Sequence, residues 1–402
     1  MKQIIVIGDN SSSNLGDPIL TQSAYYTVCR AVEGMDYVVS IFDIAGRKKQ
    51  KSMTPIPPPS THKYTQIPSV TKASSFSVLS NCIKVDVKCL VKWYLREKKQ
   101  FKKRLESSIK SESVTFVIAG GALISSSLFY ALRLNAIVNI AKRYKSRVIF
   151  NAVGIEKTVY NYGMAKYIVR HYLKQPQVVA FSTRDHVEDI PYLTNREDFQ
   201  SLLPDPGLFA AEAFGVKRKK SDTIGLSVIS YQAYQSVMFN DERACNLSPD
   251  DLLSFWEGII KGFITKGKKF KILTNGGPKD YEMALRLCQR MNLDTTQYLL
   301  PMATEPRQLV EQLSCFKLVI AHRLHALIIC TSLGIPVIPV VWSDKVAAFA
   351  KIIDNPYAQW PSANNNINEI VETFIHEDLN VNLLQAKIKE YIKKSIMLSS
   401  LY

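Results

Sequence analysis

The chain has 402 residues, of which 47% are apolar, and its 51 Lys and Arg against 35 Asp and Glu give a formal net charge of +16. This length exceeds the roughly 250–300 residues at which single hydrophobic cores stop growing, and the composition excludes a disordered chain. The positive charge favours anionic partners, which include phosphorylated substrates, acidic lipids and nucleic acids.

The cysteines and the apolar runs indicate the cellular compartment in which the protein is expected. The seven cysteines are odd in number and lack the CxxC spacing of zinc or redox sites, so we read them as reduced thiols in a cytosolic protein. The apolar run in MKQIIVIGDN is too short for a signal-peptide core. The run 326–342 contains a glycine and two prolines and is shorter than the roughly 20 residues that span a bilayer. We therefore expect a cytoplasmic protein without a transmembrane helix.

Short β-branched runs alternate with longer helical patterns along the chain, as in parallel βαβ units. The predicted strands are residues 3–7, 37–42, 115–119, 147–153 and 178–182 in the first half, and 223–228, 270–274, 318–321 and 337–340 in the second. This order predicts an α/β protein with two Rossmann-like doubly wound domains.

The domain boundary is expected in LLPDPGLFAAEAFGVKRKKSD, because two prolines, a glycine and a basic cluster separate the two strand-rich halves there. We place it near residue 215, which gives an N-terminal domain of residues 1–214 and a C-terminal domain of residues 215–402. The helical spacing of residues 383–397 predicts a last helix that packs back on the first domain.

Residues 47–110 are strongly basic. The stretch 47–66 is also rich in proline, which predicts a mobile, polyproline-like loop. Residues 83–110 then hold ten Lys or Arg against three acidic residues, with Val87, Val91, Tyr94 and Leu95 at helical spacing. Such a helix would suit the surface of an anionic membrane, or it is the solvated face of a docked helix. Nucleic acid is disfavoured, because aromatic platforms and recognition motifs are missing.

The first candidate site follows the first strand, in SSSNLGDPIL, where Asn14, Gly16 and Asp17 occur together. Gly16 permits a tight turn, and Asp17 is expected to cap the next helix, with Pro18 in its first position. That structural role explains Asp17 by itself. A ligand-binding role is equally compatible with the position, because open α/β sheets bind ligands at the carboxyl ends of their strands.

Two further strand ends in the first half carry candidate residues. Gly120 and Gly121, in FVIAGGALISSS, allow a ligand or a helix to approach the backbone closely, but they do not form a dinucleotide fingerprint. Arg184, in AFSTRDHVEDI, offers a planar fork for a carboxylate or phosphate. The alternative is an ordinary surface turn in which Arg184 pairs with Asp185.

The fourth candidate site is KLVIAHRLHALIICTSLGIPVIPVVW, in which His322, Arg323 and His325 interrupt an apolar run. The pattern predicts a strand followed by a helix, so these residues lie at the helix start, where cations repel the helix dipole unless an anion binds among them. Lys345, after the next strand, is expected at the same rim. A metal site at His322 and His325 is disfavoured, because a third ligand at a suitable spacing is missing.

Taken in order, SNLGDPIL, VIAGGALI, NAVGI, FSTRD, LPDPGLF and AHRLHALIICTSLGIPVIPVVWSDKVAAF resemble the polysaccharide pyruvyl transferase family, over about residues 1–350. The resemblance implies a fold similar to the two-domain GT-B glycosyltransferases, with the active site in the interdomain cleft. It also implies transfer of the pyruvyl group of phosphoenolpyruvate onto two hydroxyls of a sugar, as a ketal, in the synthesis of capsule, exopolysaccharide or another cell-surface glycan.

The same resemblance implies that Arg323, Leu324 and His325 bind phosphoenolpyruvate, together with an arginine from the other domain, for which Arg184 is the match. Our hypothesis is that His325 acts as the acid or as a phosphate ligand and that Asp17 acts as a base on the acceptor side. Lys345 would complete the neutralisation of the trianion, so neither a metal nor a cofactor is expected.

The acceptor is expected to be a sugar. The family resemblance, the charge and the lack of a predicted transmembrane helix are compatible with a lipid-linked oligosaccharide at the inner face of the membrane. A GT-B-like glycosyltransferase that uses a nucleotide sugar is the alternative enzyme. A binding module for phosphoglycans or membranes, built around the basic helix of residues 83–110, is the alternative without catalysis.

Overall fold

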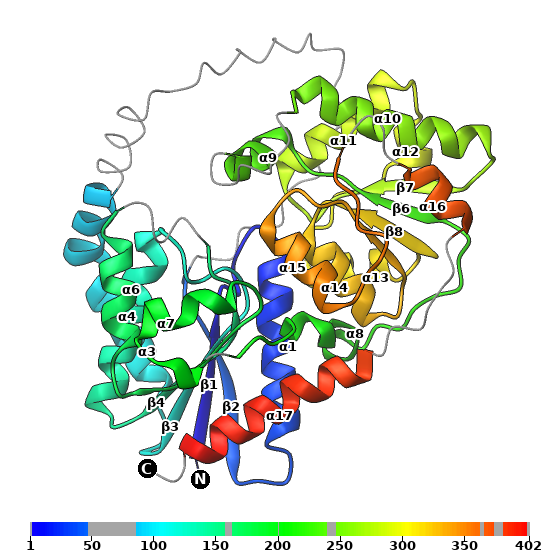
Figure 1. Cartoon of the computed structure of the whole chain (residues 1–402). Helices are drawn as coiled ribbons and strands as arrows, with labels where there is room; N and C mark the ends of the chain where they lie inside the picture. Colours follow the sequence, from blue (N-terminus) through cyan, green and yellow to red (C-terminus); the bar gives the residue numbers. More distant parts are fainter. Residues whose placement is uncertain are drawn as a thin grey trace.

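The computed structural model describes residues 2–46, 86–156, 163–199, 201–238, 247–361, 366–373 and 381–399. It contains two parallel β-sheets, each in its own lobe (Figure 1). The basic, proline-rich stretch 47–66 lies outside the described residues. Among the helices that the structure describes, none combines the length and the apolarity needed to cross a membrane.

The first sheet has the strand order β2-β1-β3-β4-β5, and every neighbouring pair is parallel. Its strands are β1 (Lys2–Gly8), β2 (Tyr37–Asp43), β3 (Val114–Ala119), β4 (Arg147–Val153) and β5 (Val178–Thr183). All six residues of β3 are buried, because helices cover both faces of the sheet at its centre. The five strands expected in the first half are therefore present.

The second sheet has the order β7-β6-β8-β9, again all parallel. Its strands are β6 (Ile224–Ser227), β7 (Phe270–Leu273), β8 (Leu318–Ala321) and β9 (Val337–Pro339). The predicted fold class, two doubly wound domains, is confirmed. The boundary near residue 215 falls in the chain between β5 and β6, and its position stays a prediction.

Helices cover both faces of the first sheet. One face is packed by α3 (Lys98–Ser108), α4 (Leu128–Arg143), α6 (Ala165–Leu173) and α7 (Ile190–Thr194), and the other by α1 (Gly16–Ala31) and α17 (Val381–Ser399). Short 3-10 segments follow β5, at Val187–Asp189, Glu197–Phe199 and Pro206–Phe209, and a π-helical turn, Trp93–Glu97, precedes α3.

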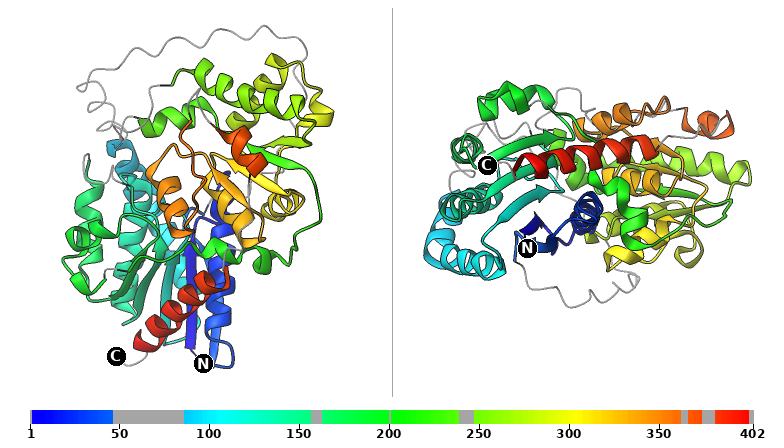
Figure 2. Two further views of the ribbon diagram at one scale, coloured as in Figure 1. Left: turned by 45° about the vertical axis from the view of Figure 1, so that its right-hand side comes forward. Right: turned by 90° about the horizontal axis from the view of Figure 1, so that it is seen from below.

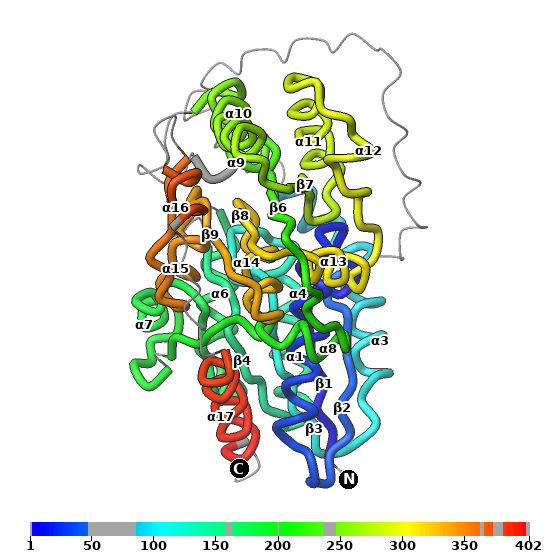
Figure 3. Tube along the Cα trace, turned by 90° about the vertical axis from the view of Figure 1, so that its right-hand side faces the viewer, coloured from blue at the N-terminus to red at the C-terminus, as the bar shows by residue number. Residues whose placement is uncertain are grey.

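The second sheet is covered in the same way (Figure 3). One face is packed by α9 (Tyr231–Met238), α10 (Pro249–Thr265), α11 (Pro278–Arg290), α12 (Thr295–Tyr298) and α16 (Ile367–Thr373). The other face is packed by α8 (Ala210–Phe214), α13 (Pro306–Leu313), α14 (Leu324–Ser332) and α15 (Asp344–Ile352).

Two helices join the lobes. The first residues of α1, among them Ile19 and Leu20, belong to the apolar cluster of the second domain, whereas Ala24 and Val28 pack on the first sheet. Helix α17 comes from the second domain and runs across the first, as the view from below in Figure 2 shows. Because both helices contribute to two cores, they position the two sheets relative to each other.

Candidate active site

The site is built where the strand order of each sheet reverses. In the first sheet this happens between β1 and β3, and in the second between β6 and β8. Ligands of open α/β sheets bind beside the carboxyl ends of the strands at such points. The loop after β1 leads to Gly16, and the loop after β8 leads to His325. A Cβ atom on Gly16 would overlap the imidazole ring of His325, so the two loops are in direct contact.

His325 is the second residue of α14 and lies against the first domain. Its Nε2 atom is 3.8 Å from Oδ1 of Asp17. Burial lowers the pKa of His325 to about 3, and the positive charges of Arg184, Arg323 and Lys345 act in the same direction. At neutral pH the free protein therefore holds a neutral imidazole there, in a strongly positive environment.

Asp17 lies opposite His325. Burial raises its pKa to about 6, against the effect of the hydrogen bond from Ser12 Oγ to Oδ2, which measures 2.8 Å. The expected capping role is wrong, because α1 begins at Gly16 with Leu15 as N-cap and has no side-chain cap. Its carboxylate is turned toward the other domain instead, and Pro18 is the third helical residue.

Arg323 is the N-cap residue of α14, and its guanidinium is held in place by an acidic partner. Nε and Nη2 donate to the two carboxylate oxygens of Asp280, at 2.7 and 2.6 Å. Asp280 is 2% exposed and also accepts a hydrogen bond from the backbone of Ser230. The amide groups of Leu324 and His325 open the helix and have no intrahelical acceptor. The sequence pattern indicated Arg323 but not Asp280.

Arg184 follows β5 and is buried, with 6% of its surface exposed. The alternative of a surface turn is therefore wrong, since its neighbour Asp185 is buried as well. Nη1 of Arg184 donates to Asp205. Burial alone would lower the pKa of Arg184, but the carboxylates of Asp205, Asp185 and Asp17 raise it. Its Nε is buried without a hydrogen-bond partner among the described residues.

Lys345 is the second residue of α15 and lies at the domain interface. Its Nζ is 2.7 Å from Oε1 of Glu156, which belongs to the first domain. The expected rim position agrees with this contact and with its effect on the pKa values of His325 and Asp17. The ion pair with Glu156 was not expected.

The remaining candidate residues of the first domain, Asn14, Gly120 and Gly121, shape the loops around Asp17. Gly120 and Gly121 both have positive φ, +78° and +69°. A Cβ atom on Gly121 would lie 3.5 Å from Oδ1 of Asp17, so this turn brings backbone close to the carboxylate. The backbone carbonyl oxygen of Asn14 accepts a hydrogen bond from the backbone N–H of Asp17, which closes the loop before α1.

His322 points away from these groups. It is fully buried, and its ring packs edge-to-face on Phe255 and Trp256 of α10, at 5.6 and 5.1 Å between centroids. Burial lowers its pKa to about 3, with Arg323 contributing in the same direction. His322 therefore does not join Arg323 and His325, because consecutive residues at a strand end face opposite sides of the sheet.

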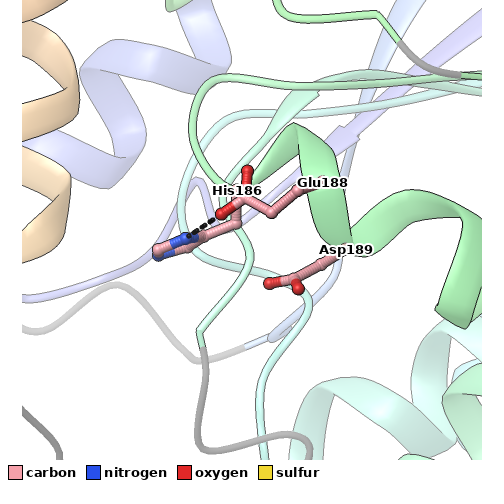
Figure 4. Close-up of side chains that lie close together, drawn as sticks. All are labelled: His186, Glu188 and Asp189. Atoms are coloured by element: carbon pink, nitrogen blue, oxygen red, sulfur yellow. Dashed lines mark hydrogen bonds and ion pairs between the residues drawn. The ribbon is translucent and has the colours of Figure 1, made fainter.

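A second group of polar side chains lies just after Arg184 (Figure 4). His186, Glu188 and Asp189 place one ligand atom each within 4.8 Å of the others, a spacing that would allow a metal ion. His186 Nδ1 lies 3.4 Å from Glu188, and its Nε2 lies 4.0 Å from Asp344 at the start of α15. His186 has a positive φ of +26°, a backbone conformation that the sequence pattern does not predict.

Comparison with known proteins gives a family and a fold. The model of the family "Polysaccharide pyruvyl transferase" matches residues 51–344. A search of curated proteins finds no match.

Among solved structures, the chain is similar to the UDP-GlcNAc 2-epimerase of Neisseria meningitidis bound to UDP-GlcNAc, at a TM-score of 0.52 and 11% identity over 98% of this chain and 100% of that one. It is also similar to a putative UDP-N-acetylglucosamine 2-epimerase of Listeria monocytogenes, at 0.54 and 8% identity over 98% of both chains. These likenesses show the GT-B-like fold alone.

Proposed function

Because the chain belongs to the polysaccharide pyruvyl transferase family, we propose that it transfers the pyruvyl group of phosphoenolpyruvate to two hydroxyls of a sugar, forming a pyruvate ketal. The observation that carries the proposal is the arrangement at the start of α14. Arg323, His325 and Lys345 of the second domain meet Arg184 and Asp17 of the first there.

This arrangement suits a small trianion. Arginine side chains and free amide groups at a helix start are strong donors to phosphate and carboxylate oxygens. Arg184 adds its positive charge from the first domain, and Leu324 and His325 supply the amide groups. The positive charges that depress the pKa of His325 would be neutralised by a bound trianion, so binding raises that pKa.

The chemistry requires one proton on the donor and the removal of two from the acceptor. A first sugar hydroxyl adds to C2 of phosphoenolpyruvate while C3 takes up a proton and becomes a methyl group. The C2–O bond to phosphate then breaks, the second hydroxyl bonds to C2, and inorganic phosphate leaves with the second proton. We assign the proton transfer to His325 and Asp17, because Asp17 has a pKa of about 6 and therefore exchanges protons near neutral pH.

The acceptor belongs to the same proposal. We place the sugar beside Asp17, Gly16 and the turn at Gly120 and Gly121, since these lie next to the donor groups of the second domain. A lipid-linked oligosaccharide of a capsule or exopolysaccharide is the proposed acceptor class.

The test is a phosphate-release assay with phosphoenolpyruvate and a panel of galactosides and mannosides, with mass spectrometry of the sugar. We expect an addition with the mass of a ketal, a donor Michaelis constant raised at least tenfold in Arg323→Ala, and turnover lost in His325→Ala. A nucleotide sugar that raises the melting temperature where phosphoenolpyruvate does not would contradict the proposal and favour a glycosyltransferase.

A further inference from the structure

The helical residues 86–108 lie on the outside of the first domain, where they run into α3 (Figure 1). They dock through Trp93, Phe101 and Leu105, which are all buried in the core of that domain. The face of this helix that packs on the first domain is therefore already buried. Any apolar residue on another face is left without a partner from that core.

A second apolar face is present and is exposed. Val87 and Val91 are 51% exposed, Tyr94 is 59% exposed and Leu95 is 79% exposed. Their spacing of four, three and one residues places them along one side of the helix. Single exposed apolar residues are common on soluble proteins, but a continuous row of them indicates an interaction surface.

Two more exposed apolar side chains lie at the start of α6. A Cβ atom on Gly163 would lie 2.8 Å from Oδ2 of Asp86, so the chain before α6 lies beside the first turn of the basic helix. Met164 and Tyr167 follow and are 49% and 67% exposed. We call the four residues of the basic helix the apolar ridge: Val87, Val91, Tyr94 and Leu95.

Positive charge surrounds the apolar ridge. Residues 86–108 contain eight Lys or Arg and three acidic residues, a local charge of +5. Two of the acids are already neutralised, because Glu97 pairs with Lys92 and Arg133 and Glu106 pairs with Arg143. Lys98 lies 4.4 Å from the ring centroid of Tyr94. Lysines beside aromatic rings in this way carry their charge at the edge of the apolar surface.

We propose that the apolar ridge and its lysines dock the protein on an anionic lipid bilayer. Helices that lie in a membrane interface combine such an apolar face with a lysine-rich polar face, and tyrosine is favoured at the depth of the lipid headgroups. A second copy of the chain fits less well, because a symmetric contact would bring two surfaces of +5 against each other.

The experiment measures flotation of the full-length protein with phosphatidylcholine vesicles, with and without phosphatidylglycerol. We expect binding only to the anionic vesicles and loss of binding at high salt. Leu95→Glu should abolish it, whereas Leu383→Glu, a change at a 55% exposed leucine of α17, should not. Lys99→Ala and Lys103→Ala should each weaken vesicle affinity about fivefold, while Lys261→Ala on α10 should have no effect.

Four results would overturn the proposal. The first is equal binding to neutral and anionic vesicles, and the second is binding that Leu95→Glu leaves intact. The third is a dimer in light scattering that Leu95→Glu dissociates, which would assign the ridge to a second copy. The fourth is a clear fall of the melting temperature in Leu95→Glu, which would mean that the chain itself covers the ridge. Turnover with a soluble acceptor should stay at the wild-type value in Leu95→Glu, because the ridge is separate from the residues around α14.

Discussion

Asp17 combines a proposed chemical role with a cost in stability. Its pKa in the folded protein is about 6, against an ordinary value of 3.8, so the folded state prefers the protonated carboxyl. That preference stabilises the protein below the ordinary pKa and is lost as the pH rises through the folded pKa. Above pH 6 the charged carboxylate therefore costs up to about 3 kcal/mol of folding free energy.

We accordingly predict that Asp17→Asn makes the protein more stable but much less active. Its free energy of unfolding in urea should exceed that of the wild type at pH 7.5, by at most about 3 kcal/mol, and the difference should vanish as the pH falls to about 4. The asparagine retains an acceptor for Ser12, so the loop before α1 is preserved. If Asp17→Asn has a lower free energy of unfolding than the wild type at pH 7.5, the charged Asp17 carboxylate does not destabilise the folded protein.

Asp280 acts on the proposed donor site through Arg323. It holds two of the three guanidinium nitrogens and is itself fixed by the amide of Ser230. Asp280→Ala should therefore raise the donor Michaelis constant about tenfold and change turnover much less, with Asp280→Asn intermediate because it keeps one acceptor for Arg323. If Arg323→Ala raises the Michaelis constant and Asp280→Ala does not, the position of Arg323 is independent of this pair.

At the scale of elements, the start of α1 is shaped to receive the start of α14. Gly16 has no room for a methyl group because the ring of His325 occupies that space. We predict that Gly16→Ala lowers kcat/KM about a hundredfold, since a displacement of about 1 Å at a reacting group has that effect. The matched control is Gly258→Ala on α10, where a Cβ meets nothing within 4 Å. That change should leave activity unaltered and add about 0.5–1 kcal/mol of stability.

The strands were predictable, whereas most partners of the site residues were not. All nine expected strands are present, because β-branched runs bounded by turn residues depend on local sequence. The placement of Arg323 and His325 at a helix start followed from the same patterns. Asp280 and Glu156 could not be predicted, because tertiary packing brings them to Arg323 and Lys345 from 43 and 189 residues away. The capping role expected for Asp17 is wrong because the other domain offers its carboxylate a different neighbour.

For the whole molecule, the proposed site and the proposed membrane surface use the same excess of positive charge in two different ways. Around α14 the charges are buried or paired with carboxylates, which suits the recognition of a small anion. Around the apolar ridge they are exposed on flexible lysines, which suits the diffuse charge of a bilayer. A transferase that works on a lipid-linked acceptor needs both, since the donor comes from solution and the acceptor from the membrane.

The ion pair between Lys345 and Glu156 connects the two domains across this site, and we expect it to compete with the bound donor. Lys345 is 31% and Glu156 is 35% exposed, so breaking the pair costs only about 0.2–1 kcal/mol. A bound trianion competes with Glu156 for the same ammonium group. Glu156→Gln should therefore lower the donor Michaelis constant by up to about fivefold, and Lys345→Gln should raise it. Measured at low salt, a higher Michaelis constant in Glu156→Gln would show instead that the pair holds the two domains in the geometry that binds the donor.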